Sequence, residues 1–239
     1  MTVAPGRLTL CCADMDARPL FWTTEGGDRD GYEPAAAARV ADALGVELVW
    51  AFHRWDRFAQ ALADGEVDAI WCGSAITDER RRVFSYSRPY AAIDEAVLVR
   101  ADSDIHDLAG LRGRRVGAIA ASTNMALAET FDAGELVAFD GSSDDVFAEM
   151  IEAVRSGAVD AMVDDEPAFG AQLASGAYRV AHVAPTQNPW GAACRLGDRQ
   201  MVALLDDGLA RAIGSGALAA EWTRWFGDKP VPTAIAPSP

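Results

Sequence analysis

The sequence has few basic residues, histidines and cysteines. Lysine and arginine number 21 against 36 aspartates and glutamates, which gives the 239-residue chain a formal net charge of −15. Nucleic-acid binding depends on a basic surface that neutralises phosphates, so we expect no nucleic-acid partner. The three histidines are far apart in the sequence, and the four cysteines lack the CxxC spacing of zinc sites. We therefore expect no metal or other cofactor.

The cysteines leave two states open. Cys11 and Cys12 are adjacent in a strand-like run, so their side chains point to opposite faces of the strand. Buried free thiols are the favoured interpretation. A disulfide that joins Cys72 or Cys194 to one of this pair is the alternative.

Long apolar runs are also absent. None reaches the roughly 20 residues that a membrane-spanning helix needs. The first ten residues, MTVAPGRLTL, lack the charged-then-apolar pattern of an export signal. We expect either that such a signal has been removed or that the protein stays in the cytoplasm.

The sequence does have a regular alternation of strand and helix patterns. In the first part, apolar runs predict strands at residues 8–12, 46–52 and 67–71, and helical spacing predicts helices at 35–44 and 55–63. Such alternation is typical of a parallel sheet with crossover helices, in which ligands bind beyond the carboxyl ends of the strands. Asp14, Trp55 and the segment 72–80 each follow a predicted strand, so we expect them to meet at one edge of the sheet.

The second part repeats this plan. Strands are predicted at residues 96–100, 115–120, 136–139, 159–163 and 179–183, with amphipathic helices between several of them. Two lobes of similar plan imply a ligand cleft between them. Helices are expected again at 200–214 and 217–226, and the Pro-rich residues 229–239 are expected to be disordered.

Residues 67–90, VDAIWCGSAITDERRRVFSYSRPY, are the most informative stretch. A buried strand runs into small residues at 72–75, where backbone N–H groups can be exposed. Thr77 or Asp78 fits a helix N-cap, and Arg80 follows closely. Free amides and a guanidinium at a strand end are suited to holding a carboxylate.

This stretch resembles the most distinctive segment of the amino-acid-binding family of ABC-transporter solute-binding proteins. In that family a helix-start Thr-x-x-Arg precedes Phe-Ser-x-Pro-Tyr, and SAITDERRRVFSYSRPY is similar. Further similarity lies in the Gly-Tyr-Glu-Pro turn at residues 31–34, in GRRVG at 113–117 and in GAVDAMVDDEP at 157–167. The resemblance covers roughly residues 8–228.

The resemblance implies a type II periplasmic-binding fold, which is an α/β fold. It has two Rossmann-like lobes with a ligand cleft between them, joined by a two-strand hinge. We expect residues 1–98 and 193–239 to form the first lobe, including the tail 229–239, and residues 99–192 to form the second.

The family also implies roles for individual residues. Arg80 corresponds to the bidentate clamp on the α-carboxylate of the ligand, helped by the backbone at Gly73 and Ala75. Trp55 corresponds to an aromatic wall over the ligand, and Asp14 lies where the family contacts the ligand side chain.

In the second lobe, Asp165 corresponds to the acceptor for the α-ammonium group. If the match to the family motif is displaced by one residue, Asp164 has this role instead. Thr123, with Ser122, would donate to the carboxylate. The sequence departs from the pattern where Ala75 replaces a hydroxyl residue and where Ala121 replaces a glycine.

The resemblance therefore implies a non-catalytic protein that binds a small amino acid or related amine and delivers it to a membrane permease. We expect a monomer outside the cytoplasm. A first alternative is an enzyme that resembles cyclohexadienyl dehydratases, which needs a general acid in the cleft and no ammonium-binding carboxylate. A second alternative is a cytoplasmic amino-acid sensor domain.

Overall fold

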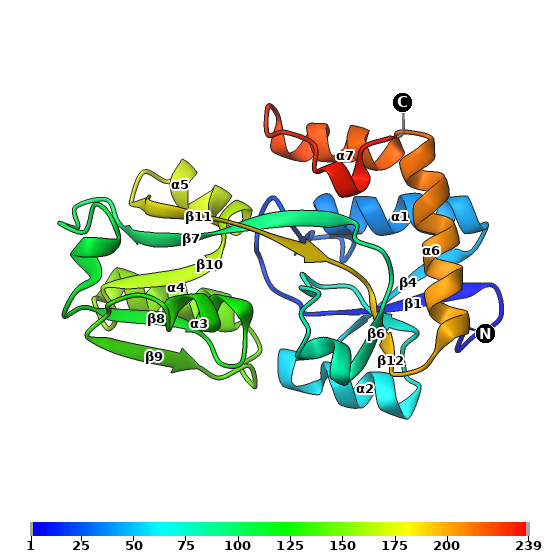
Figure 1. The fold of residues 1–239 in the computed structure, drawn as a ribbon, viewed down its shortest axis with the longest axis horizontal. Coiled ribbons are helices and arrows are strands. Elements are labelled where there is room, and N and C mark those ends of the chain that lie inside the picture. The colour runs from blue at the N-terminus through cyan, green and yellow to red at the C-terminus, as the bar shows by residue number, and fades with distance from the viewer. Residues whose placement is uncertain (1, 238–239) are drawn as a thin grey trace. The chain divides into compact units, whose positions relative to one another are not determined.

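The structure, a computed structural model, describes residues 2–237 and divides into two compact units (Figure 1). Unit 1 contains Met1–Asp14, Thr23–Ala92 and Asn188–Pro239, and unit 2 contains Met15–Trp22 and Ile93–Gln187. Each unit has a five-stranded sheet and helices packed against it. The predicted α/β fold class is confirmed.

The sheet of unit 1 has the strand order β4-β1-β5-β12-β6. The bounds are Arg7–Cys12 for β1, Glu47–Phe52 for β4, Ala69–Ile70 for β5, Phe84–Tyr86 for β6 and Ala193–Arg195 for β12. Strand β1 runs parallel to β4 and β5, whereas β12 is antiparallel to β5 and β6. The parallel strands therefore place their carboxyl ends at one edge, as predicted.

Helices of unit 1 pack against this sheet and against one another. They are α1 (Tyr32–Leu44), α2 (Phe58–Asp64), α6 (Arg199–Gly214) and α7 (Ala217–Phe226). Helix α1 contacts both α6 and α7 (Figure 1). The approach of α6 depends on Gly208, because a Cβ atom there would lie 2.8 Å from Val40 Cγ1.

The sheet of unit 2 has the strand order β11-β7-β10-β8-β9. The bounds are Ala91–Arg100 for β7, Arg115–Ile119 for β8, Glu135–Phe139 for β9, Ala161–Asp165 for β10 and Tyr178–Trp190 for β11. Strands β8, β9 and β10 are parallel, and β7 runs antiparallel to β10. The helices of this unit are α3 (Thr123–Ala128), α4 (Val146–Ser156) and α5 (Gly170–Ala174).

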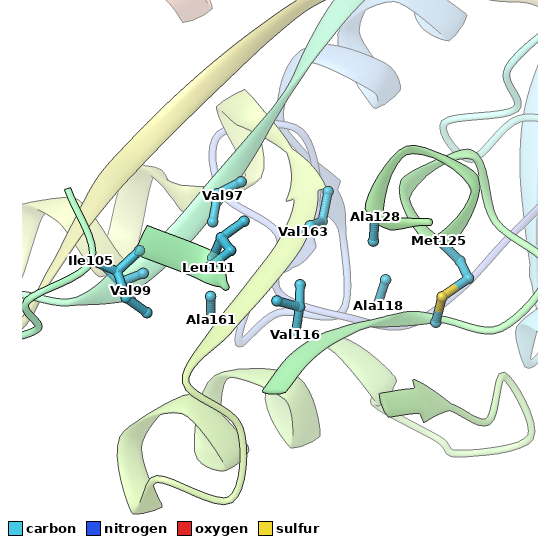
Figure 2. Close-up of a cluster of buried hydrophobic side chains, with 10 residues drawn as sticks. All are labelled: Val97, Val99, Ile105, Leu111, Val116, Ala118, Met125, Ala128, Ala161 and Val163. Carbon is cyan, nitrogen blue, oxygen red and sulfur yellow. The ribbon is translucent and has the colours of Figure 1, made fainter. Parts of the chain in front are cut away.

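A cluster of buried apolar side chains in unit 2 joins α3 to the strands β7, β8 and β10. Figure 2 shows its buried members, which are Val97, Val99, Ile105, Leu111, Val116, Ala118, Met125, Ala128, Ala161 and Val163. Helix α3 packs against β8 and β10. This packing fixes the start of α3 beside the carboxyl ends of these strands.

Short elements connect the larger ones. They are β2 (Trp22–Thr23), β3 (Arg29–Asp30), and the 3₁₀ helices η1 (Trp55–Arg57), η2 (Arg80–Arg82), η3 (Leu108–Leu111), η4 (Glu166–Phe169) and η5 (Thr233–Ile235). The prediction of a disordered tail at 229–239 is wrong over the described part, because η5 buries Ile235 completely. Residues 238–239 lie outside the described range.

Other differences concern element lengths. Strand β11 continues to Trp190, seven residues beyond the predicted strand at 179–183. Strand β7 begins five residues before the predicted strand at 96–100. Helix α4 begins at Val146, and the side chain of its N-cap Asp145 accepts a hydrogen bond from the Ala148 N–H. All four cysteines are buried free thiols, which confirms the favoured interpretation.

Candidate functional site

In unit 1, a buried glutamate holds the loop that follows β5. Glu33, in the first turn of α1, accepts hydrogen bonds on Oε1 from the Gly73 N–H at 2.8 Å and from the Tyr90 hydroxyl at 2.6 Å. The Tyr90 ring stacks on Trp71, with ring centroids 4.0 Å apart. The Gly73 amide, a predicted ligand donor, is thus engaged within the unit.

Burial dominates the electrostatics of this glutamate. Its side chain is 1% exposed, and burial raises the pKa of Glu33 to about 7, although the two hydrogen bonds and the charge of Arg29 act in the opposite direction. The carboxyl group that holds the Gly73 N–H therefore gains or loses its proton close to neutral pH.

Arg80 lies in η2, directly after this loop. The N-cap of η2 is Glu79 rather than the predicted Thr77 or Asp78, although the Thr77 hydroxyl accepts a hydrogen bond from the Arg80 N–H at 3.1 Å. The guanidinium group donates to the Ala75 carbonyl at 3.4 Å, and its Cζ lies 5.8 Å from the centroid of the Trp55 ring. Among residues 2–237, Arg80 forms no ion pair. Its positive charge is therefore open to a ligand carboxylate.

Trp55 and Ala75 complete this part of unit 1. Trp55 begins η1 directly after β4, and its ring packs at a tilt on Phe58, with ring centroids 5.2 Å apart. Ala75 forms an isolated antiparallel bridge with Trp190, which fixes the backbone beside the guanidinium. The structure thus brings together three of the predicted site residues, Trp55, Ala75 and Arg80.

Asp14 lies just beyond the end of β1. Its Oδ1 accepts a hydrogen bond from the Thr23 hydroxyl at 2.5 Å and lies 3.9 Å from an Arg29 guanidinium nitrogen. The Arg29 side chain is only 2% exposed, whereas that of Asp14 is 60% exposed. Asp14 is thus oriented by two neighbours while its carboxylate still faces solvent.

In unit 2, Ser122 is the N-cap of α3. Its hydroxyl accepts a hydrogen bond from the Met125 N–H at 3.0 Å and donates to the Ile119 carbonyl at 2.6 Å. This hydroxyl therefore serves the fold, and Thr123, the first residue of the helix, is the more exposed of the two candidates. The preceding Ala121 adopts φ 57°, a left-handed conformation that explains why a glycine is expected there.

Asp165 is the last residue of β10 and lies opposite Glu95 of β7 in the ladder. Glu95, which is 2% exposed, accepts a hydrogen bond from the Asn124 amide at 3.1 Å. Asp164 is buried, and its Oδ1 accepts from the Asp165 N–H at 2.7 Å. Burial, together with the charge of Glu95, raises the pKa of Asp164.

Two residues beside the candidate site were missed in the sequence, Glu33 and Glu95. Glu33 stands in the recognised Gly-Tyr-Glu-Pro turn, but nothing local shows that it reaches Gly73. Glu95 precedes the predicted strand at 96–100, and its acidic side chain next to four apolar residues was the available signal.

The described residues form neither a metal site nor a membrane-spanning helix. No group of three or more His, Cys, Asp or Glu side chains is arranged to hold a metal ion. In the same part of the chain, every helix is too short or too polar to cross a bilayer.

Comparisons with known proteins agree with the resemblance seen in the sequence. The family model of bacterial extracellular solute-binding proteins, family 3, matches residues 10–228. A probable histidine-binding protein of Neisseria gonorrhoeae is 24% identical over 230 residues, which cover 93% of this chain and 84% of that protein.

Solved structures of similar fold include an ancestral arginine-binding protein bound to arginine, with a TM-score of 0.82 and 26% identity over 93% of this chain and 99% of that one. An ancestral amino acid-binding protein, described as a precursor of cyclohexadienyl dehydratase, has a TM-score of 0.77 and 27% identity over 92% of this chain and 95% of that one. The predicted type II periplasmic-binding fold is confirmed. The chain belongs to family 3 of the bacterial extracellular solute-binding proteins.

Proposed function

We propose that this protein is the solute-binding component of an ABC transporter and binds a small amino acid, or a related zwitterion or amine, by closure of its two units. The observation that carries this proposal is the Arg80 guanidinium, which lies over Trp55 beside Ala75 with no ion-pair partner in residues 2–237. A fork-shaped guanidinium is the protein group best matched to a carboxylate.

Unit 2 supplies the complementary charge. Asp165 ends β10, and Thr123 begins α3 within the same unit. A carboxylate accepts hydrogen bonds from an ammonium group, and the Thr123 hydroxyl and amide are donors for a carboxylate. Asp14 is the residue that we assign to the ligand side chain. An amino acid thus has a partner for each of its charged groups.

A ligand that needs groups from both units favours their closed arrangement over the open one. Strands β7 and β11 each contain residues of unit 1 and of unit 2, so we assign them the role of the hinge. The lobe boundaries near residues 98 and 193 stay predictions.

Members of this family are extracytoplasmic binding proteins of ABC transporters, and we propose the same location, a permease partner and a monomeric state for this chain. The similar proteins are mostly binding proteins without catalytic activity, although one neighbour is a precursor of a dehydratase. The carboxylate of Asp165 favours ammonium binding over that chemistry, so we do not propose catalysis.

A thermal-shift screen against the amino acids and small amines tests the proposal. A ligand present at about 100 times its Kd stabilises the folded state by about 2.7 kcal/mol, which raises Tm by roughly 5–10 °C for a chain of this size. Failure of the whole panel to raise Tm would refute the proposal.

Calorimetry with the best ligand then tests the clamp. We expect Arg80→Ala to weaken binding by about 100-fold or more, because the ligand carboxylate loses a charged partner. Arg82→Ala is the matched control, since Arg82 is an exposed arginine of the same 3₁₀ helix. Equal affinity in the two variants would contradict the assignment of Arg80.

A further inference from the structure

Unit 1 has a groove between strand β6 and helix α6, and its lining includes none of the residues assigned to the ligand. The two elements contact each other, and the groove has a volume of about 390 Å³. The helix lines it with the residues at positions 199, 202, 203 and 206, whose spacing corresponds to one helix face. The strand lines it with all three of its residues. Because successive strand residues point to opposite faces, such a groove follows the edge of the strand.

Strand β6 is the last strand of its sheet, and β12 is its only ladder partner in residues 2–237. The Ser87 N–H donates to the Ala192 carbonyl at 3.0 Å, just beyond the end of this ladder. Hydrogen-bonded pairs alternate along an antiparallel ladder, so the N–H and C=O groups of Phe84 and Tyr86 point away from β12. These groups form a short template on which a further strand can pair.

The groove also has positive charge that no acidic residue neutralises. Arg81 and Arg199 line it, both are exposed, and neither forms an ion pair within the described part of the chain. Asp206 lines the groove too, but its Oδ1 accepts from the Arg88 N–H at 2.6 Å and lies 4.0 Å from the Arg88 guanidinium. The groove is therefore locally basic, on a protein whose formal net charge is −15.

Exposed apolar side chains lie at the amino-terminal end of the same strand. Leu196 is 62% exposed and Val83 is 58% exposed, and these are the two most exposed large apolar side chains of the described residues. The ladder pairs Phe84 with Arg195, so Val83 and Leu196 directly follow the last pair of β6 and β12. A partner that covers this edge would bury both.

We propose that this groove binds an extended acidic peptide segment of a partner protein, which adds to the sheet of unit 1 beside β6. The outward backbone groups of Phe84 and Tyr86 pair with the segment. Arg81 and Arg199 meet its acidic side chains, and its apolar side chains cover the exposed apolar end. In strand addition of this kind the backbone supplies affinity and the side chains supply specificity. The inference goes beyond the proposed function, because the ligand site takes no part in it.

A second copy of this chain is the less favourable occupant. Pairing of β6 with the same strand of another copy, about a two-fold axis, would bring the arginines of both grooves together. Like charges at a strand pair are destabilising. The basic edge therefore opposes self-association and attracts an acidic segment.

Fluorescence anisotropy with the full chain and labelled hexapeptides tests the proposal. One probe alternates glutamate and valine, and the other alternates glutamine and valine, which keeps the size and removes the charge. We expect the acidic peptide to bind about 10-fold more tightly, and high salt to remove this difference. General attraction cannot explain such a result, because the protein as a whole is negative. N-methylation of alternate backbone amides removes the N–H donors for strand pairing and should abolish binding.

Variants then locate the binding. Arg81→Gln combined with Arg199→Gln should weaken the acidic peptide by about 10-fold and leave the glutamine peptide unchanged. Both arginines are exposed, so we expect the double variant to fold. Arg211→Gln is the matched control, since Arg211 belongs to the same helix, pairs with Asp207 at 2.6 Å and does not line the groove.

Three outcomes would overturn the proposal. The first is equal affinity for the two peptides, or binding of neither. The second is an acidic peptide whose affinity the double variant leaves unchanged, because its site is then elsewhere. The third is a concentration-dependent dimer in sedimentation that the acidic peptide dissociates, because a second copy then occupies the groove.

Discussion

The buried carboxyl group of Glu33 makes the stability of unit 1 depend on pH. Its pKa is raised from an ordinary 4.5 to about 7 in the folded protein because the side chain is buried. Between these values the folded state still holds a proton that the unfolded chain has released. The contribution of Glu33 to stability is therefore fully present below pH 4.5 and is lost as the pH rises through about 7.

The magnitude follows from the two pKa values. A tenfold change in proton affinity corresponds to about 1.4 kcal/mol, so the ionisation of Glu33 costs the folded state about 3 kcal/mol at pH 8. Glu33→Gln removes this ionisation. The amide oxygen of the glutamine can still accept from the Gly73 N–H and the Tyr90 hydroxyl, so the loop after β5 keeps its anchor.

Urea unfolding, monitored by tryptophan fluorescence, measures this effect in unit 1. Six of the seven tryptophans belong to unit 1, which also contains Glu33. We expect Glu33→Gln to gain about 3 kcal/mol over the native protein at pH 8 and almost nothing at pH 4.5. Glu47→Gln is the control, because Glu47 is an exposed acid in a surface pair with Arg7. Parallel pH profiles for Glu33→Gln and the native protein would refute the reasoning.

Three further predictions concern stability. Ala121→Gly should raise the free energy of unfolding by about 0.5–1 kcal/mol in denaturant titrations. The backbone strain of an alanine at φ 57° exceeds the extra conformational entropy that a glycine loses on folding. A lower free energy of unfolding in the variant would contradict this. Gly208→Ala should lower Tm through the clash of α6 with α1, at a cost of about 1–3 kcal/mol, whereas Gly214→Ala, with open space around it, should not. Asp164→Asn should flatten the loss of stability of unit 2 as the pH rises above 3.8, since the pKa of Asp164 is raised by burial; an unchanged pH profile would count against it.

The sequence predicted most of the fold because the relevant signals are local. Helix α7 has the predicted bounds, and Gly45 and Gly157 end their helices in the left-handed conformation that favours glycine. Strand lengths were predicted less well, because they depend on pairing with distant segments. Strand β11 tolerates Pro189 because it lies at the edge of its sheet, where a missing N–H costs little.

The same distinction applies to the candidate site. The motif predicted Arg80, Trp55 and Ala75, which lie together in unit 1 because they follow β4 and β5, the two strands on either side of β1. The roles of Glu33 and Glu95 depend on contacts with residues at least 29 positions away. Such pairings follow from packing and ladder register, and no local pattern reveals them.

The acidic residues of this protein lie both at the surface and in the interior, and the composition alone does not distinguish the two groups. A net charge of −15 does not show which acidic residues lie at the surface, and several carboxylates of the described residues are buried. Asp68 accepts backbone N–H groups on both oxygens, and Glu221 pairs with Arg39, so each has partners that hold the fold together. Asp164 differs, because one of its buried oxygens has no hydrogen-bond partner within residues 2–237, and it is adjacent to the predicted ligand residue Asp165. Buried carboxylates with protein partners stabilise the fold, whereas a buried carboxylate without one is costly as an anion, and burial accordingly raises the pKa of Asp164.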